Sequence, residues 1–199
     1  MSSWPKLKKD QQIIDQVRRI LDTGNLPQAQ FRQIMDKAKI NGASGTRLLN
    51  NLEQLTVRGF AGLRVVLSDL EIGGNKFQGA AFMLEYIGDN NLWGSVTEFE
   101  APREDRRIDA IIRRTQYEFK SWGEFRAGTF LEQIGKDYER TGLRGVRWVL
   151  QKRELGDKAA VVQLMTDALK DRELRRKYGI NQTQAKNIID ELDRIVIVY

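Results

Sequence analysis

The stretch RRIDAIIRRTQYEFKSW, residues 106–122, decides how the middle of this chain folds. Its two halves, 107–112 and 116–121, are rich in β-branched, aromatic and apolar residues, which favour strands. Charged residues at 113–114 separate the two halves and leave room for a turn between them. The stretch therefore predicts two neighbouring strands near the centre of the chain.

Three charged side chains converge if these strands form a hairpin. Successive side chains on a strand alternate between faces, so Glu118 and Lys120 share one face and Phe119 takes the other. A turn at residues 113–114 places Asp109 directly opposite Glu118, with Cβ atoms about 4.5–5.5 Å apart. Arg-Arg-Thr is not the Asn-Gly or Asp-Gly of a tight hairpin, and a slip of one residue would point Asp109 away.

Two carboxylates and a lysine at this spacing suit one particular chemistry. Carboxylate oxygens hold Mg²⁺ together with water and phosphate oxygens, and the bound ion makes that water a better nucleophile. Lys120 would stabilise the negative charge that develops on a phosphate. These residues predict a metal-dependent nuclease, with Mg²⁺ favoured over Mn²⁺ or Zn²⁺. A solvated strand face is the alternative, although Glu118-Phe-Lys120 is the only acid-x-lysine pattern in the chain.

The amino-acid sequences of two segments resemble those of a known family. Ile-Asp-Ala-Ile-Ile (108–112) and Tyr-Glu-Phe-Lys-Ser-Trp (117–122) are similar to the PD-(D/E)xK nuclease superfamily, whose core is an αβββαβ unit. More narrowly, they resemble nuclease domains at the carboxyl ends of bacterial polymorphic toxins, among them contact-dependent growth inhibition toxins. The resemblance covers residues 73–150, and it departs from the superfamily pattern at Ile108, where a proline often stands.

The resemblance implies an α+β fold. A helical N-terminal region would precede an αβββαβ restriction-endonuclease-like core with extra C-terminal helices and a final strand. The helix expected at 75–87 carries Glu85, which the resemblance adds to the metal site beside Asp109 and Glu118; an exposed helix carboxylate is the alternative. The helix expected at 125–141 carries Gln133, which would assist at the site, and Tyr138, which is expected to pack or to stack on bases.

The charge pattern predicts an anionic partner. The chain has 33 basic and 27 acidic residues, a net charge of +6 and a pI near 9.6. Basic side chains around a cleft bind phosphates by releasing counterions, whereas ordinary solubility charge is the alternative. The residues expected to contact nucleic acid are Arg103, Arg106, Arg107, Arg113, Arg114 and Arg144. A second basic cluster lies at residues 170–177, and both explanations stay open for it.

Absent residue types exclude several reaction classes. Without histidine or cysteine, the chain cannot use a two-histidine ribonuclease mechanism, a nucleophilic cysteine, a Ser-His-Asp triad or the common zinc sites. No glycine-rich phosphate loop occurs. No apolar run is long enough to span a bilayer, so stable membrane insertion is not expected. Chemistry on a hard metal ion held by carboxylates is what remains.

The chain is expected to have two parts. Residues 1–72 form a helical region, either a structural cap or, by resemblance to toxins, a translocation module, and residues 73–199 form the nuclease domain. Gly73-Gly74 is the candidate boundary. Helices are expected over 158–193, with a cap near Asn181, and residues 195–199 are expected to complete the sheet as a buried strand or, alternatively, to offer an edge to another chain.

The leading functional prediction is an endonuclease that acts on DNA, slightly favoured, or on transfer RNA. By the resemblance, it is a bacterial toxin effector, secreted as part of a larger protein, acting in the cytoplasm of a target cell and neutralised by an acidic immunity protein. A DNA repair or junction-resolving nuclease, which would be cytoplasmic, is the alternative within enzymes. A basic protein that binds nucleic acid without cutting it is the alternative from another class.

Overall fold

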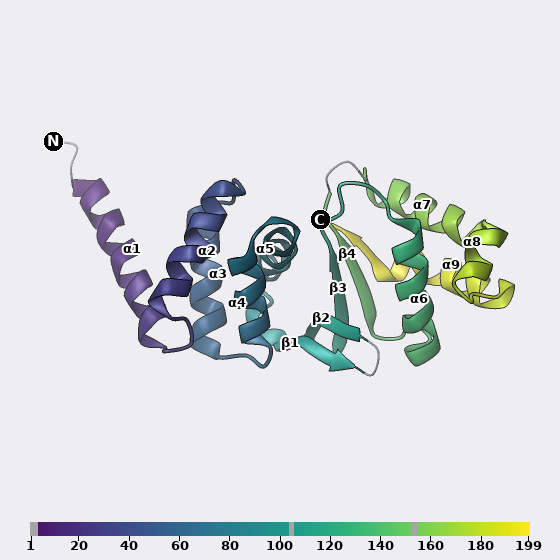
Figure 1. Ribbon diagram of the computed structural model, residues 1–199, viewed down its shortest axis with the longest axis horizontal. Helices are drawn as coiled ribbons and strands as arrows, with labels where there is room; N and C mark the ends of the chain where they lie inside the picture. Colours follow the sequence, from purple (N-terminus) through teal and green to yellow (C-terminus); the bar gives the residue numbers. More distant parts are fainter. Residues whose placement is uncertain (1–3, 104–105, 153–154) are drawn as a thin grey trace. The chain divides into compact units, whose positions relative to one another are not determined.

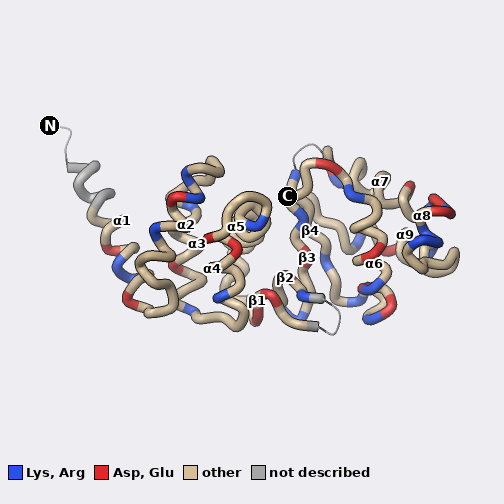
Figure 2. Tube along the Cα trace, viewed as in Figure 1, with Lys and Arg blue, Asp and Glu red and all other residues tan. Residues whose placement is uncertain are grey.

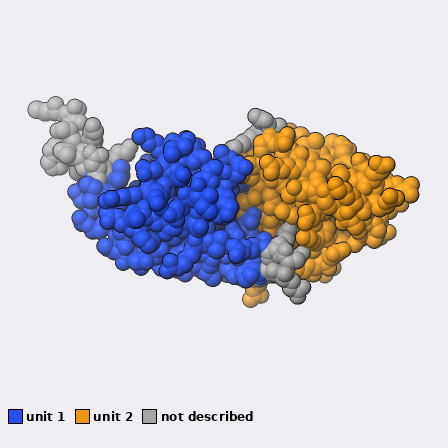
Figure 3. Space-filling view, viewed as in Figure 1, with its two compact units in different colours: residues 1–110 blue, residues 111–199 orange. Residues whose placement is uncertain are grey.

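The chain packs as two compact units, residues 1–110 and 111–199 (Figure 3). The computed structural model describes the backbone of residues 4–103, 106–152 and 155–199, together with their side chains except those of residues 4–10, 103 and 106.

Helices dominate the first unit, as the apolar periodicity predicts. In chain order they are α1 (Trp4–Asp22), α2 (Gln28–Ile40), α3 (Gly45–Arg58), α4 (Leu63–Ile72) and α5 (Gly74–Asp89) (Figure 1). A 3-10 turn, η1 (Trp93–Ser95), leads into the strands β1 (Val96–Arg103) and β2 (Arg106–Ile112). The predicted helical character of the N-terminal region and the helix predicted at 75–87 are thereby confirmed.

Polar contacts join α1 to α3. The Nε atom of Arg19 donates to Oε1 of Glu53 over 2.6 Å, and Nε2 of Gln16 donates to Oε2 of the same carboxylate over 2.8 Å. The hydrogen bond from Arg19 holds the pKa of Glu53 below its ordinary value. Because this carboxylate is anionic at neutral pH, the two helices stay linked under ordinary conditions.

The first unit extends well beyond the predicted boundary at Gly73-Gly74. α5 packs on α3 and α4, because its apolar face needs their side chains to leave water: Phe77 is 1% exposed, and Leu84 and Ile87 are fully buried. Gly73 and Gly74 lie where α4 ends and α5 begins, and both helices belong to the same core. The unit also takes in β1, which docks on the loop before α4: the N–H of Phe99 donates to the carbonyl of Ala61 over 2.9 Å.

The second unit alternates strands and helices. Its elements after the end of β2 are β3 (Thr115–Lys120), α6 (Ala127–Thr141), β4 (Val146–Leu150), α7 (Lys158–Lys170), α8 (Arg172–Lys177), α9 (Gln182–Ile195) and β5 (Val196–Val198) (Figure 1). The strands of the chain form one mixed sheet in the order β1-β2-β3-β4-β5, with β4 parallel to both β3 and β5. This is the predicted α+β fold, including the αβββαβ succession from α5 to β4.

Helices α6, α7 and α9 bury one face of β3 and β4. Phe130 of α6 is fully buried and meets the indole of Trp148 edge-on, with ring centroids 5.6 Å apart. α9 begins at the predicted cap: Asn181 and Gln184 form a capping box. β5 lies at the end of the strand order, so the predicted closing strand is an edge strand whose first residue alone is buried.

The hairpin turn between β2 and β3 has an unusual sequence for its geometry. Arg113 and Arg114 both have positive φ, 50° and 65°, in a two-residue connection. Positive φ at both central residues defines a type I′ turn, which favours Asn-Gly because side chains with a Cβ are strained there. The hairpin therefore forms at the expected place although the sequence lacks the expected turn residues.

Replacing Arg113-Arg114 with Asn-Gly should stabilise the protein by about 1 kcal/mol, because both new residues tolerate positive φ. Urea unfolding at constant pH measures this change. The same exchange at an exposed pair within a helix, Gln11-Gln12 of α1 to Asn-Gly, should instead destabilise it by a similar amount. A loss of stability on the hairpin exchange would contradict the strain assigned to the turn.

Candidate active site

Strand β3 brings Glu118 and Lys120 together on one side. The Nζ atom of Lys120 lies 3.0 Å from Oε2 of Glu118, as the alternation along the strand predicts. Their side chains are 11% and 3% exposed, respectively. Phe119 points to the opposite face, where its ring stacks on Tyr117. Glu118 is therefore buried and Lys120 partly buried, which contradicts the solvated strand face considered for these residues.

The neighbouring strand supplies an aromatic wall for the pair. In the parallel register, Glu118 is paired with Trp148, so the two side chains share a face of the sheet. The ammonium of Lys120 lies over the indole ring of Trp148, 5.3 Å from its centroid. A cation held over an indole face is attracted by the ring quadrupole. Lys120 is thereby fixed by an acid on its own strand and by a ring on the next one.

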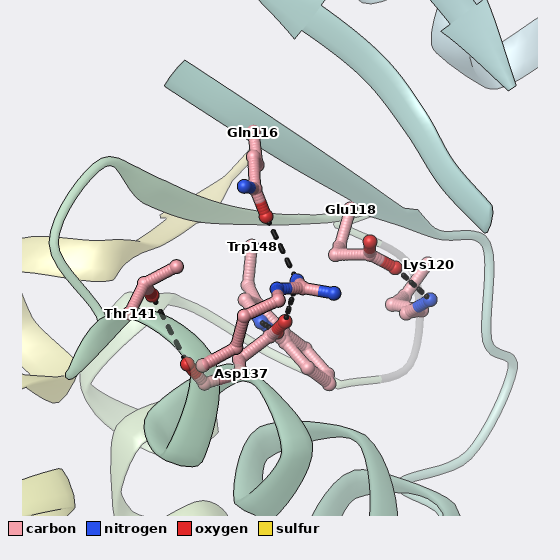
Figure 4. A network of polar contacts seen from close by, with 7 residues as sticks. Gln116, Glu118, Lys120, Asp137, Thr141 and Trp148 are labelled. Atoms are coloured by element: carbon pink, nitrogen blue, oxygen red, sulfur yellow. Dashed lines mark hydrogen bonds and ion pairs between the residues drawn. The ribbon is translucent and has the colours of Figure 1, made fainter. Parts of the chain in front are cut away.

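Helix α6 completes a polar network around the indole (Figure 4). The indole Nε1 of Trp148 donates to Oδ2 of Asp137 over 3.2 Å. Arg140 donates to Oδ1 of Asp137 over 3.0 Å and, with the same Nη2 atom, to Oε1 of Gln116 over 2.9 Å. The contacts run from β3 through β4 to α6 and back to β3. They fix the position of the ring on which Lys120 rests.

Asp137 is the residue that sequence reasoning missed. It is fully buried, although acids are seldom buried without partners. The helical periodicity of α6 could have indicated its burial. Phe130, Ile134 and Asp137 fall at spacings of four and three, so the acid occupies a position on the apolar face of the helix. A charged residue inside an apolar stripe points to a buried partner, here the indole N–H and Arg140.

Gln133 lies on α6 one turn before Asp137, so both side chains share a helix face. Its Oε1 atom is shielded from solvent and has no hydrogen-bond partner among the described residues. A buried acceptor without a donor costs roughly 1–3 kcal/mol. Tyr138, by contrast, packs against the core of the second unit and accepts a hydrogen bond from Asn187 at its hydroxyl, which confirms the packing role.

The other predicted acids belong to the first unit. Asp109 lies on β2 and Glu85 on α5, and both side chains are partly buried. Their convergence with Glu118 therefore stays a prediction. Within the parts of the chain that the structure describes, no group of three or more acidic, histidine or cysteine residues is arranged to hold a metal ion.

The structure describes the side chains of four of the six arginines predicted to contact nucleic acid. The side chains of Arg103 and Arg106 lie outside the described residues. Arg107 on β2, the turn residues Arg113 and Arg114, and Arg144 before β4 are exposed. These four guanidinium groups are accessible to a phosphate.

Comparison with known proteins gives no relative: no family model matches the chain, nor does any curated protein or solved structure. Among the described residues, no helix has the length and apolar character to cross a membrane.

Replacing Asp137 with alanine should destabilise the protein by about 3 kcal/mol, because the indole N–H of Trp148 and the guanidinium of Arg140 lose a buried acceptor. Chemical denaturation measures the change. Asp190→Ala, at an exposed acid on α9, serves as the control and should have little effect. An equal loss in both variants would mean that the network does not hold Trp148 in place.

Proposed function

We propose that the protein is a metal-dependent endonuclease that hydrolyses nucleic-acid phosphodiesters. The observation that carries this proposal is the ion pair of buried Glu118 and partly buried Lys120, whose side chains are only 3% and 11% exposed and whose charged atoms lie 3.0 Å apart. Burying two charges costs roughly several kcal/mol per ion, and apolar residues of the same volume often stabilise a protein as well or better. A buried pair at this place therefore calls for a role other than stability, and reaction chemistry provides one.

The hairpin supports Asp109 as the third member of the site. A two-residue turn at 113–114 pairs Ile112 with Thr115, because the strands on either side of such a turn run antiparallel and start pairing at once. Counting back along both strands then pairs Asp109 with Glu118. We infer from this register that the two carboxylates approach each other across β2 and β3.

The donor atoms fit a hard divalent ion. Asp109 and Glu118, with Glu85 assisting, offer only carboxylate oxygens, which are the ligands that Mg²⁺ and Mn²⁺ prefer. These residues would hold the ion, and the shielded, unpartnered Oε1 of Gln133 is a further oxygen on the helix that covers β3 and β4. When bound, such an ion would polarise the phosphate and lower the pKa of its water.

Other side chains of the protein would stabilise charge, orient the attacking water and hold these groups in position. Lys120 would stabilise the negative charge that develops on the phosphate, with its position fixed by Glu118 and by the indole of Trp148. Gln133 would accept a hydrogen bond from the attacking water through Oε1 and orient it. Asp137 acts one step further away, because it holds Trp148 and touches no reacting atom.

DNA or transfer RNA is the proposed substrate, and DNA is slightly favoured. Exposed Arg107, Arg113, Arg114 and Arg144 support phosphate contacts without sequence preference. Purified protein should be incubated with supercoiled plasmid and with total transfer RNA, each with Mg²⁺, with Mn²⁺ and with excess EDTA. Cleavage of one substrate that depends on the metal supports the proposal. Tight binding with no cleavage in any metal would replace it with a non-catalytic nucleic-acid-binding protein.

We further propose that this nuclease is a bacterial toxin effector, delivered to the cytoplasm of a target cell as part of a larger secreted protein. The support is the resemblance of residues 73–150 to toxin nuclease domains, together with a net charge of +6 that an acidic immunity protein would complement. Expression in a bacterial cytoplasm should arrest growth, and co-expression of an adjacent small acidic reading frame should restore it. Normal growth on expression of an active nuclease would argue for a repair enzyme.

A further inference from the structure

A basic pocket lies in the second unit on residues that the proposed active site does not use. α8 and the start of α9 form it, and Figure 2 colours the Lys and Arg positions along α8 blue. Its lining consists of Arg172, Arg175, Arg176, Ile180, Asn181 and Gln182. Arg175 and Arg176 stand three and four residues after Arg172 along the helix, so both are neighbours of Arg172 in the lining of this pocket.

The guanidinium groups of these arginines have no side-chain partner among the described residues. In the described part of the chain, no ion pair or side-chain hydrogen bond joins any of Arg172, Arg175 and Arg176 to another residue. The Nε atom of Arg175 is shielded from solvent and has no partner there either. Like charges three and four residues apart on a helix repel each other. An anion in the pocket would offer acceptors to the guanidinium groups that line it and relieve the repulsion.

The start of α9 adds backbone donors to the same pocket. The capping box uses the N–H groups of Asn181 and Gln184. It leaves the N–H groups of Gln182 and Thr183 without a partner among the described residues. Free amides and the positive end of the helix dipole attract anions. The pocket thus combines guanidinium forks with backbone amides.

We infer that this pocket binds a phosphate group and, resting on the proposed function, that it holds a backbone phosphate of the nucleic acid away from the cleaved bond. The planar fork of arginine matches the oxygens of phosphate in a bidentate way, which a lysine ammonium does not. The pocket presents three such forks. It extends the nucleic-acid contact surface to α8, where the sequence left phosphate binding and solubility charge as open alternatives.

The first test uses inorganic phosphate as the probe. Nuclear magnetic resonance of labelled protein should show the amides of Gln182 and Thr183 shifting as phosphate is added. In a triple variant, Arg172→Gln, Arg175→Gln and Arg176→Gln, the affinity should fall at least about tenfold. A control triple at exposed lysines of the same unit, Lys152→Gln, Lys158→Gln and Lys186→Gln, should keep it.

A second variant removes one amide without changing any charge. Gln182 is the first residue of α9, where proline is favoured, and Asn181 before it is extended, with φ −77° and ψ 171°. Gln182→Pro should therefore keep the fold and weaken phosphate binding by about threefold to tenfold. If phosphate binding is unchanged in both this variant and the triple arginine variant, the inference that the pocket binds phosphate is wrong.

The last test asks whether nucleic acid is the occupant. Binding of labelled duplex DNA and of transfer RNA is measured in EDTA over a range of salt. The arginine triple should reduce the slope of log affinity against log salt by about 1, and the lysine triple by less. Phosphate shifts with unaltered nucleic-acid binding would mean that the pocket takes free phosphate, which overturns the inference. Because EDTA prevents cleavage, a failed nuclease assay with Mg²⁺ is a separate result and refutes only the proposed reaction.

Discussion

Asp109→Asn should lower the cleavage rate at least about a hundredfold to a thousandfold, because asparagine keeps the size of the side chain and removes one of the anionic ligands. The strand and its register need no adjustment, so nucleic-acid binding in EDTA and the unfolding midpoint should stay close to wild type. Initial rates on plasmid and on transfer RNA with Mg²⁺ measure the effect. The same variant should permit growth when expressed in a bacterial cytoplasm.

Asp190→Asn supplies the matched control for this experiment. Asp190 is an exposed acid on α9, outside the proposed site, and its substitution removes the same charge. The control should cleave at the wild-type rate. If the Asp109 variant does so as well, β2 contributes no ligand, and the hairpin register on which the proposal depends is wrong.

Lys120→Met should lower both the cleavage rate and the stability of the protein. It removes the ammonium that would stabilise developing charge, so cleavage should fall about a hundredfold or more. It also leaves Glu118 buried beside an apolar side chain, which should destabilise the protein by roughly 3–5 kcal/mol. Rates must therefore be measured well below the unfolding midpoint, with the folded fraction checked in the same samples.

A double variant separates the two effects. Glu118→Gln combined with Lys120→Met removes both charges, so most of the stability lost in Lys120→Met should return. Activity should not return, because the metal ligand and the cation are both missing. A double variant that is stable and fully active would show that the pair serves only the fold.

Local sequence pattern predicted much of what forms the candidate site. The period of two in residues 116–121 placed Glu118 beside Lys120, and that contact needs no information from outside the strand. Helical periods located α5 and α6, and side-chain chemistry located the cap at Asn181. These features were predictable because each depends on residues that lie close together in the sequence.

Features set by distant partners were not predictable. Asp137 is buried where it meets the indole of Trp148 on β4, and the helix sequence shows nothing of that contact beyond a charge in an apolar stripe. Arg113 and Arg114 adopt positive φ because strand pairing on both sides outweighs their local preference. The division of the chain depends on α5 packing backwards onto α3 and α4, and the sequence offered only a pair of glycines.

The backward packing of α5 limits how this protein can be dissected. A fragment that begins at residue 73 would present the side chains of Phe77, Leu84 and Ile87 to water, since α3 and α4 would be gone. Exposed apolar patches of this kind promote aggregation. Loss of activity in such a truncation would then report insolubility and say nothing about delivery, so single substitutions are the sound way to ask what the amino-terminal helices do.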